Sequence, residues 1–66
     1  MRVVLDVNPA VRGISKVMEL LHEKFPAAEM EPFSQVSLRV TIDSDDMLRF
    51  CETLDMLALF YTEIKQ

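Results

Sequence analysis

The chain of 66 residues has almost none of the residue types that stabilise very small proteins. It contains one cysteine, Cys51, and one histidine, His22, so it can form no internal disulfide and offers few soft ligands to a metal. Domains of this size often depend on disulfides, metals or association, because they bury only about 60% of their unfolded surface. Association is the option that remains open. A single thiol without a partner also fits a reducing compartment, so we expect a cytoplasmic protein.

Glycine, long apolar runs and clustered positive charge are also scarce. The single glycine excludes a glycine-rich phosphate loop, and no serine lies in a G-x-S-x-G context. No apolar run approaches the ~20 residues that cross a bilayer, and the first nine residues are too soon interrupted by Asp6 and Pro9 to be a secretory signal. Seven scattered basic residues against eleven acidic ones give a net charge of −4, which disfavours nucleic acid. We therefore expect no membrane, no nucleic acid and no cofactor as partner.

What is present is apolar sequence with clear periodicity. Half of the residues are apolar, and we expect one domain spanning residues 1–66. In residues 2–7 the side chains alternate, with Val3, Leu5 and Val7 on one face, which predicts a strand.

A helix is expected to follow directly. Asn8 is a good N-cap and Pro9 suits the first helical position, while Pro26 ends the helix. The apolar positions recur at helical spacing and predict one core-facing side. They are Ala10, Ile14, Val17, Met18, Leu21 and Phe25.

The middle of the chain predicts one strand and leaves another open. Residues 28–33 fit either a short edge strand, which tolerates Pro32, or a connecting loop. Residues 36–42 alternate clearly and predict a strand with one buried face and one face that is solvated or covered by a partner. The positions expected to be buried are Val36, Leu38, Val40 and Ile42.

The last third of the chain allows two interpretations. One apolar seam follows a 3-4-3-4-3 spacing through Met47, Phe50, Leu54, Leu57, Tyr61 and Ile64, which predicts a helix running to the end of the chain. Alternatively the helix ends near Met56 and residues 58–64 form a strand, since Phe60, Tyr61 and Thr62 favour strands. No glycine or proline separates the two parts, so we favour the continuous helix.

The order of these elements, strand, helix, possible strand, strand and helix, predicts the fold class. It is a small two-layer α/β (α+β) domain with the order β-α-(β)-β-α. The two amphipathic helices are expected to pack side by side on one face of a small sheet.

Three carboxylates, Asp43, Asp45 and Asp46, stand directly before the last helix. We expect Asp43 or Ser44 to cap that helix, because acidic side chains are stabilised at a helix N-terminus. The alternative is a metal site that pairs Asp43 with Asp6 at the end of the first strand. That site requires the two strands to be parallel, and an intervening strand at residues 28–33 would make them antiparallel. We favour capping and expect no metal.

The two remaining reactive side chains offer no catalytic arrangement. His22 lies at the edge of the apolar side of the first helix, beside Glu19 and Glu23, without an evident partner for proton transfer. Cys51 falls on the inward seam of the last helix, where a cysteine acts as a small hydrophobe. We therefore expect no catalytic residue and no enzyme activity.

The last helix has apolar residues on its outer side too, and a two-layer domain of this size has no further element to cover them. Four of them, Leu48, Met56, Leu59 and Phe60, lie opposite the core seam. A helix that is apolar nearly all round is normally buried all round, so these residues indicate an interaction patch.

The sequence thus predicts a small acidic protein that acts by protein–protein binding. It would be a regulator, inhibitor or antitoxin-like factor, with itself as a homodimer or another protein as partner. The alternative is a regulatory domain that senses a small molecule at the interface of paired sheets. A metal-dependent enzyme through Asp6 and Asp43 is the third and weakest reading.

Overall fold

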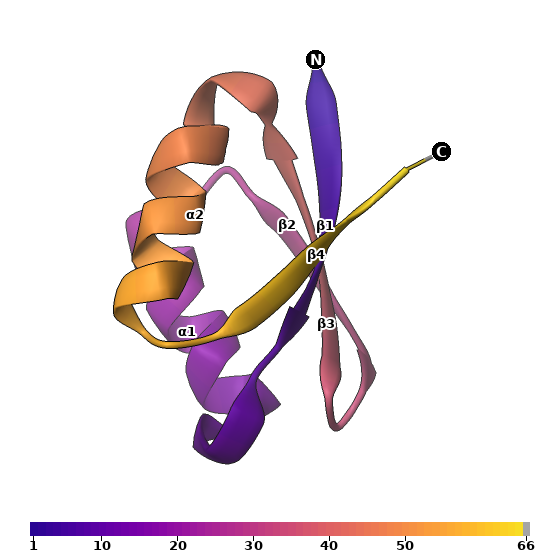
Figure 1. The fold of residues 1–66 in the computed structure, drawn as a ribbon, viewed down its shortest axis with the longest axis vertical. Coiled ribbons are helices and arrows are strands. Elements are labelled where there is room, and N and C mark those ends of the chain that lie inside the picture. Colours follow the sequence, from indigo (N-terminus) through magenta and orange to yellow (C-terminus); the bar gives the residue numbers. More distant parts are fainter. Residues whose placement is uncertain (66) are drawn as a thin grey trace.

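A computed structural model of the protein describes residues 1–65 and places two helices on one face of an antiparallel sheet (Figure 1). Along the chain the described elements are β1 (Arg2–Asn8), a 3-10 turn (Ala10–Arg12), α1 (Ile14–Lys24), β2 (Glu29–Ser34), β3 (Ser37–Asp43), a second 3-10 turn (Ser44–Asp46), α2 (Met47–Met56) and β4 (Phe60–Ile64). This confirms the predicted two-layer α+β fold. Within the described residues no helix is both long and apolar enough for a transmembrane span.

The sheet has the strand order β2-β3-β1-β4, and all neighbours are antiparallel. Each helix therefore joins two parallel strands that are separated by a third strand, as in the split β-α-β arrangement called ferredoxin-like. The hairpin from β2 to β3 reverses the chain. Residues 28–33, which the sequence left open, thus supply an edge strand, and its edge position tolerates Pro32.

The alternation of apolar residues in β1 and β3 builds the floor of the core, as predicted. Leu5 and Val7 of β1 are fully covered by the helices. The covered residues of β3 are Leu38, Val40 and Ile42. The prediction for Val36 is wrong, because the strand begins one residue later and Val36 lies exposed in the hairpin.

α1 begins at Ile14, five residues later than the sequence suggested. Asn8 ends β1, and its Oδ1 accepts a hydrogen bond from the Ala10 N–H at 2.8 Å. Only a short 3-10 turn follows, because Gly13 adopts φ 84° and thereby interrupts the helix. Residues other than glycine rarely adopt this backbone conformation. Ala10 is therefore exposed, whereas the later positions of the predicted apolar side pack inward. Those are Ile14, Val17, Met18, Leu21 and Phe25.

The preferred continuous C-terminal helix is wrong, and the alternative is confirmed. α2 ends at Met56, and a Schellman motif turns the chain into β4. The Leu59 N–H donates to the Leu54 carbonyl and the Ala58 N–H to the Asp55 carbonyl, both at 3.0 Å. Ala58 takes the left-handed position with φ 57° that glycine usually occupies.

The two helices meet over the middle of the sheet. Phe25, at the end of α1, packs edge-on against Phe50 of α2, with ring centroids 5.0 Å apart. Both rings are buried, and Leu54 and Leu59 close the core on the side of β4.

Candidate functional site

The helices cover one face of the sheet, and within the described residues no element covers the other (Figure 1). Side chains alternate along a strand, and residues paired in register share a face, so the register identifies the members of this face. They are Arg2, Val4, Asp6 and Asn8 of β1, Glu29, Glu31 and Phe33 of β2, Ser37, Arg39, Thr41 and Asp43 of β3, and Phe60, Thr62 and Ile64 of β4. We call this set the open sheet face.

Arg39 stands at the centre of the open sheet face, between Glu31 of β2 and Asp6 of β1 in register. Its guanidinium lies over the ring of Phe33, with Cζ 3.8 Å from the ring centroid. Such stacking favours a cation over an aromatic face and fixes the direction of the long side chain. Phe33 is thereby placed on the open sheet face although β2 is irregular around it.

The hydrogen-bonding capacity of Arg39 is not used up. Its Nε atom is buried and has no hydrogen-bond partner within residues 1–65. Neither of the flanking carboxylates forms an ion pair with it in the described chain. The Asp6 carboxylate instead accepts a hydrogen bond from the Ser37 hydroxyl through Oδ1. A guanidinium has five N–H donors, so Arg39 can still bind a carboxylate or another acceptor placed above the sheet.

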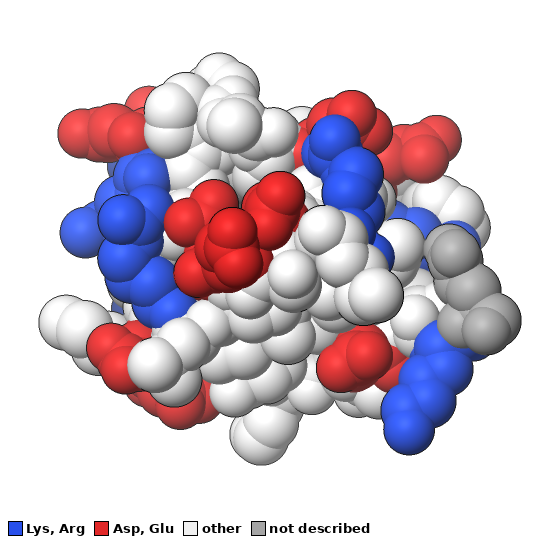
Figure 2. All heavy atoms as spheres, turned by 90° about the horizontal axis from the view of Figure 1, so that it is seen from above, with Lys and Arg blue, Asp and Glu red and all other residues white. Residues whose placement is uncertain are grey.

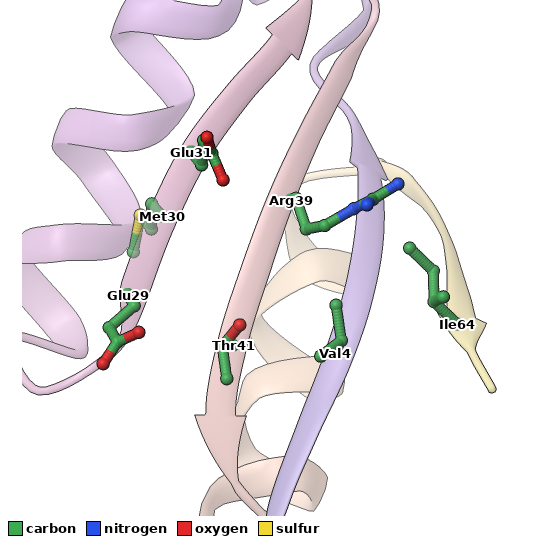
Figure 3. Close-up of a pocket in the computed structure, with 7 residues that line it drawn as sticks. All are labelled: Val4, Glu29, Met30, Glu31, Arg39, Thr41 and Ile64. Atoms are coloured by element: carbon green, nitrogen blue, oxygen red, sulfur yellow. The ribbon is translucent and has the colours of Figure 1, made fainter. Parts of the chain in front are cut away.

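A shallow hollow of about 490 Å³ lies beside Arg39 (Figure 3). Its lining comes from all four strands and combines one guanidinium, two carboxylates and apolar side chains. The lining residues are Val4, Glu29, Met30, Glu31, Arg39, Thr41 and Ile64. The hollow therefore has the mixed polar and apolar character of a surface that meets a partner or a small ligand.

Asp43 caps the 3-10 turn that leads into α2, so the predicted cap lies one turn before the helix, and α2 itself has no side-chain cap at Asp46. Asp43 accepts a hydrogen bond from the Asp45 N–H at 2.9 Å, and this bond begins the 3-10 turn that leads into α2. The cap is Asp43 rather than Ser44, whose N–H donates to the Met1 carbonyl at 2.7 Å. Figure 2 shows acidic side chains gathered in the middle of the end of the molecule that carries this connection, with basic side chains on both sides.

The alternative metal site through Asp6 and Asp43 is wrong. β1 and β3 are antiparallel, so Asp6 pairs with Arg39 whereas Asp43 pairs with Arg2. Four residues of strand, or about 13 Å, thus separate the two carboxylates along the sheet. Within residues 1–65 no group of three His, Cys, Asp or Glu side chains is arranged to hold a metal ion.

The structure divides the predicted interaction patch between three locations. Leu48 and Met56 are 75% and 86% exposed on the outer side of α2. Phe60 is 79% exposed but lies on the open sheet face, beside Asn8. Leu59 is only 5% exposed, so its predicted exposure is wrong, because the Schellman motif directs it into the core against Leu54.

The remaining reactive side chains lie apart from the open sheet face. His22 is exposed on α1, near Met18 and Met30. Cys51 is partly buried on the inner side of α2, facing β4. A hydrogen-bonding contact with Cys51 raises the pKa of Tyr61 to about 12, and desolvation and the charges of Cys51 and Asp55 act in the same direction.

The sequence located only part of this surface. The outward alternation of residues 36–42 already indicated a face that is either solvated or covered by a partner. The contact between Phe33 and Arg39 was not foreseeable, because it depends on β2, which the sequence left open. Comparisons of the chain with models of protein families, with curated proteins and with solved structures found no match.

Proposed function

We propose that this protein acts by binding proteins rather than by catalysis, as a regulator, inhibitor or antitoxin-like factor. It would work in the cytoplasm, where a lone thiol such as Cys51 stays reduced. Neither nucleic acid nor a cofactor is part of the proposal, because the chain is acidic and its basic residues are scattered.

The observation that carries the proposal is the exposure of Leu48 and Met56 beside a core that is already complete. Eight positions apart in a helix, these side chains differ by only about 80° in direction and lie on one side of α2. Glu52 lies between them and is exposed. An apolar pair with an acidic residue in its middle suits a partner that presents an apolar pocket with a basic rim.

Affinity capture from the native cell, followed by mass spectrometry, tests this proposal. The wild type is compared with a Leu48→Glu and Met56→Glu double variant, and Val11→Glu serves as a control. Val11 is equally apolar and fully exposed, but it lies in the 3-10 turn before α1. The captured protein should be lost with the double variant and retained with the control.

Circular dichroism must show that all three chains are folded. The proposal fails if the folded double variant captures the same proteins as the wild type.

A second candidate function, the sensing of a small molecule, is favoured by the hollow beside Arg39. An anionic ligand could use the free donors of Arg39 while its apolar part lies against Val4 and Ile64. Thermal shift measurements with anionic metabolites would test it, since a ligand that binds the native state raises the melting temperature. The shift should disappear in Arg39→Gln, and a flat response across the metabolites would leave this candidate without support.

A further inference from the structure

We propose that the open sheet face binds a second copy of the same chain, with a two-fold axis that runs parallel to the strands between β1 and β3. This inference rests on the proposed function, protein binding, and names a second copy of the chain as the protein that the open sheet face binds. The open sheet face is separate from the outer side of α2, where Leu48 and Met56 lie. The two surfaces can therefore be tested independently.

The charges that β1 and β3 place on the open sheet face are complementary about this axis. Rotation places β3 of one copy over β1 of the other, so each residue faces the residue that is its cross-strand partner within one chain. Arg39 then faces Asp6 of the second copy, and Asp43 faces Arg2, because these are the pairs in register. Each such contact occurs twice in the dimer.

The central contact is also the one that the single chain leaves incomplete. Arg39 forms no ion pair within residues 1–65, so its terminal nitrogens remain available, and the Ser37 hydroxyl occupies only Oδ1 of Asp6. Packed sheets lie about 10 Å apart, so Arg39 would turn from the ring of its own Phe33 and extend toward Asp6 of the second copy to bridge the gap. Stacked sheets are rotated by about 30°, which displaces residues near the centre least. Arg39 and Asp6 lie close to the middle of their strands.

The edges of the face agree with the same axis. Rotation brings β2 of one copy over β4 of the other. Phe33 and Phe60 lie at the same end of the sheet on opposite edges. Phe33 of one copy would therefore meet Phe60 of the other copy across the interface. Both rings are now exposed, Phe33 by 55% and Phe60 by 79%.

The other symmetric arrangement is disfavoured. A two-fold axis perpendicular to the strands, at the level of Arg39, would place each strand over its own copy. Arg39 would then face Arg39, Glu31 would face Glu31, and Asp6 would face Asp6. Like charges in direct opposition destabilise an interface. About the proposed axis, by contrast, Glu31 faces Thr62 and Glu29 faces Ile64.

The size of the face sets the expected strength of association. Four strands about 4.8 Å apart and about six residues long form a face of roughly 400 Å². Stable complexes usually bury about 800 Å² of surface per partner, so we expect a reversible dimer that dissociates on dilution.

A charge exchange between two variants tests the contact. Arg39→Asp and Asp6→Arg should each raise the dimer dissociation constant at least about tenfold, because each variant places like charges opposite one another. An equimolar mixture of the two should regain the dimer, since every central contact then joins an aspartate to an arginine. Analytical ultracentrifugation over a range of concentrations measures this, with circular dichroism on the same samples.

Lys16→Asp and Glu23→Arg are the matched controls, because both residues are exposed on α1, on the other layer. Each control should dimerise like the wild type. If either central variant fails to fold, Phe60→Glu replaces it, since this exposed side chain is not needed in the core, and its folded form should be monomeric.

Three results would overturn the proposal: a wild type that stays monomeric at high concentration, single variants that dimerise unchanged, or a mixture that stays monomeric. None of them affects the partner bound through Leu48 and Met56. Conversely, if the affinity capture fails to support a partner for Leu48 and Met56, the charge-exchange experiment still tests the dimer independently.

Discussion

Tyr61 is the single tyrosine of the chain, and there is no tryptophan, so its ionisation can be observed without interference from other aromatic groups. Its pKa is raised to about 12, first by the hydrogen-bonding contact with Cys51. The folded state therefore holds the phenolic proton more tightly than the unfolded state, whose tyrosine titrates near 10. By linkage, this contribution to stability is complete below pH 10 and is lost as the pH rises from 10 to 12.

Ultraviolet absorbance of the phenolate measures the shift directly. The midpoint should lie clearly above that of the urea-unfolded chain, and Cys51→Ala should lower it because the hydrogen-bonding contact that contributes most to the shift is removed. An unshifted midpoint in the folded wild type would contradict the arrangement of Tyr61, Cys51 and Asp55.

Asp43 is the second residue whose role can be isolated. Asp43→Ala removes the acceptor of the Asp45 N–H and should lower the free energy of unfolding by about 0.5–2 kcal/mol, the usual effect of losing an N-cap. Asp43→Asn keeps an acceptor at the same place and should cost much less. Urea denaturation at low protein concentration gives both values, and equal losses for the two variants would refute the cap.

At the scale of elements, the Schellman motif between α2 and β4 decides how the last third of the chain folds. Ala58 carries φ 57°, a left-handed conformation that costs an alanine about 1–2 kcal/mol relative to a right-handed one. Glycine adopts it without this cost but loses more entropy on folding. We therefore expect Ala58→Gly to stabilise the protein by about 0.5–1 kcal/mol.

Thermal and urea unfolding of Ala58→Gly would check this value. Ala27→Gly is a suitable control, because Ala27 is exposed and is not among the residues with positive φ. The control should be neutral or slightly destabilising. An Ala58→Gly variant less stable than the wild type would mean that the turn is not strained.

The same turn shows where the sequence could and could not predict the fold. The strong alternation of Leu38, Val40 and Ile42 predicted β3 because burial on one face requires it. The end of α2 was missed because the residue at the turn is alanine, and nothing in its chemistry indicates a left-handed conformation. The sequence prediction therefore put Leu59 on the exposed side of the helix, because the direction of its side chain is set by the turn and not by helical periodicity.

The candidate surface was predictable to a similar degree. Exposure of Leu48 and Met56 follows from their place opposite the seam of α2, and the structure agrees. The opposed charges of Asp6 and Arg39 depend on the register between two strands that are far apart in the sequence. Register between such strands is set by the assembled core, so no local pattern could reveal it.

At the scale of the whole molecule, β1 is the strand on which the rest of the sheet depends. It pairs with β3 on one side and with β4 on the other. Removal of residues 59–66 would delete Leu59 from the core and leave one edge of β1 unpaired. In a chain this small the stability margin is only a few kcal/mol, so we expect the shortened chain not to fold.

Circular dichroism during heating would show the loss as the absence of a cooperative transition. Removal of residues 65–66 alone leaves β4 intact and should preserve the transition. A cooperative melt of the longer truncation would contradict the central role of β1.

The central position of β1 also has a consequence for the time course of folding. Val4 of β1 pairs with Ile64 of the edge strand β4, so this contact joins residues that are 60 positions apart in the sequence. Such contacts raise the contact order, and chains of high contact order fold more slowly because long loops must close before the contacts form. Until β4 arrives, β1 presents an unpaired edge to neighbouring molecules, and intermolecular pairing along that edge competes with the last step of folding.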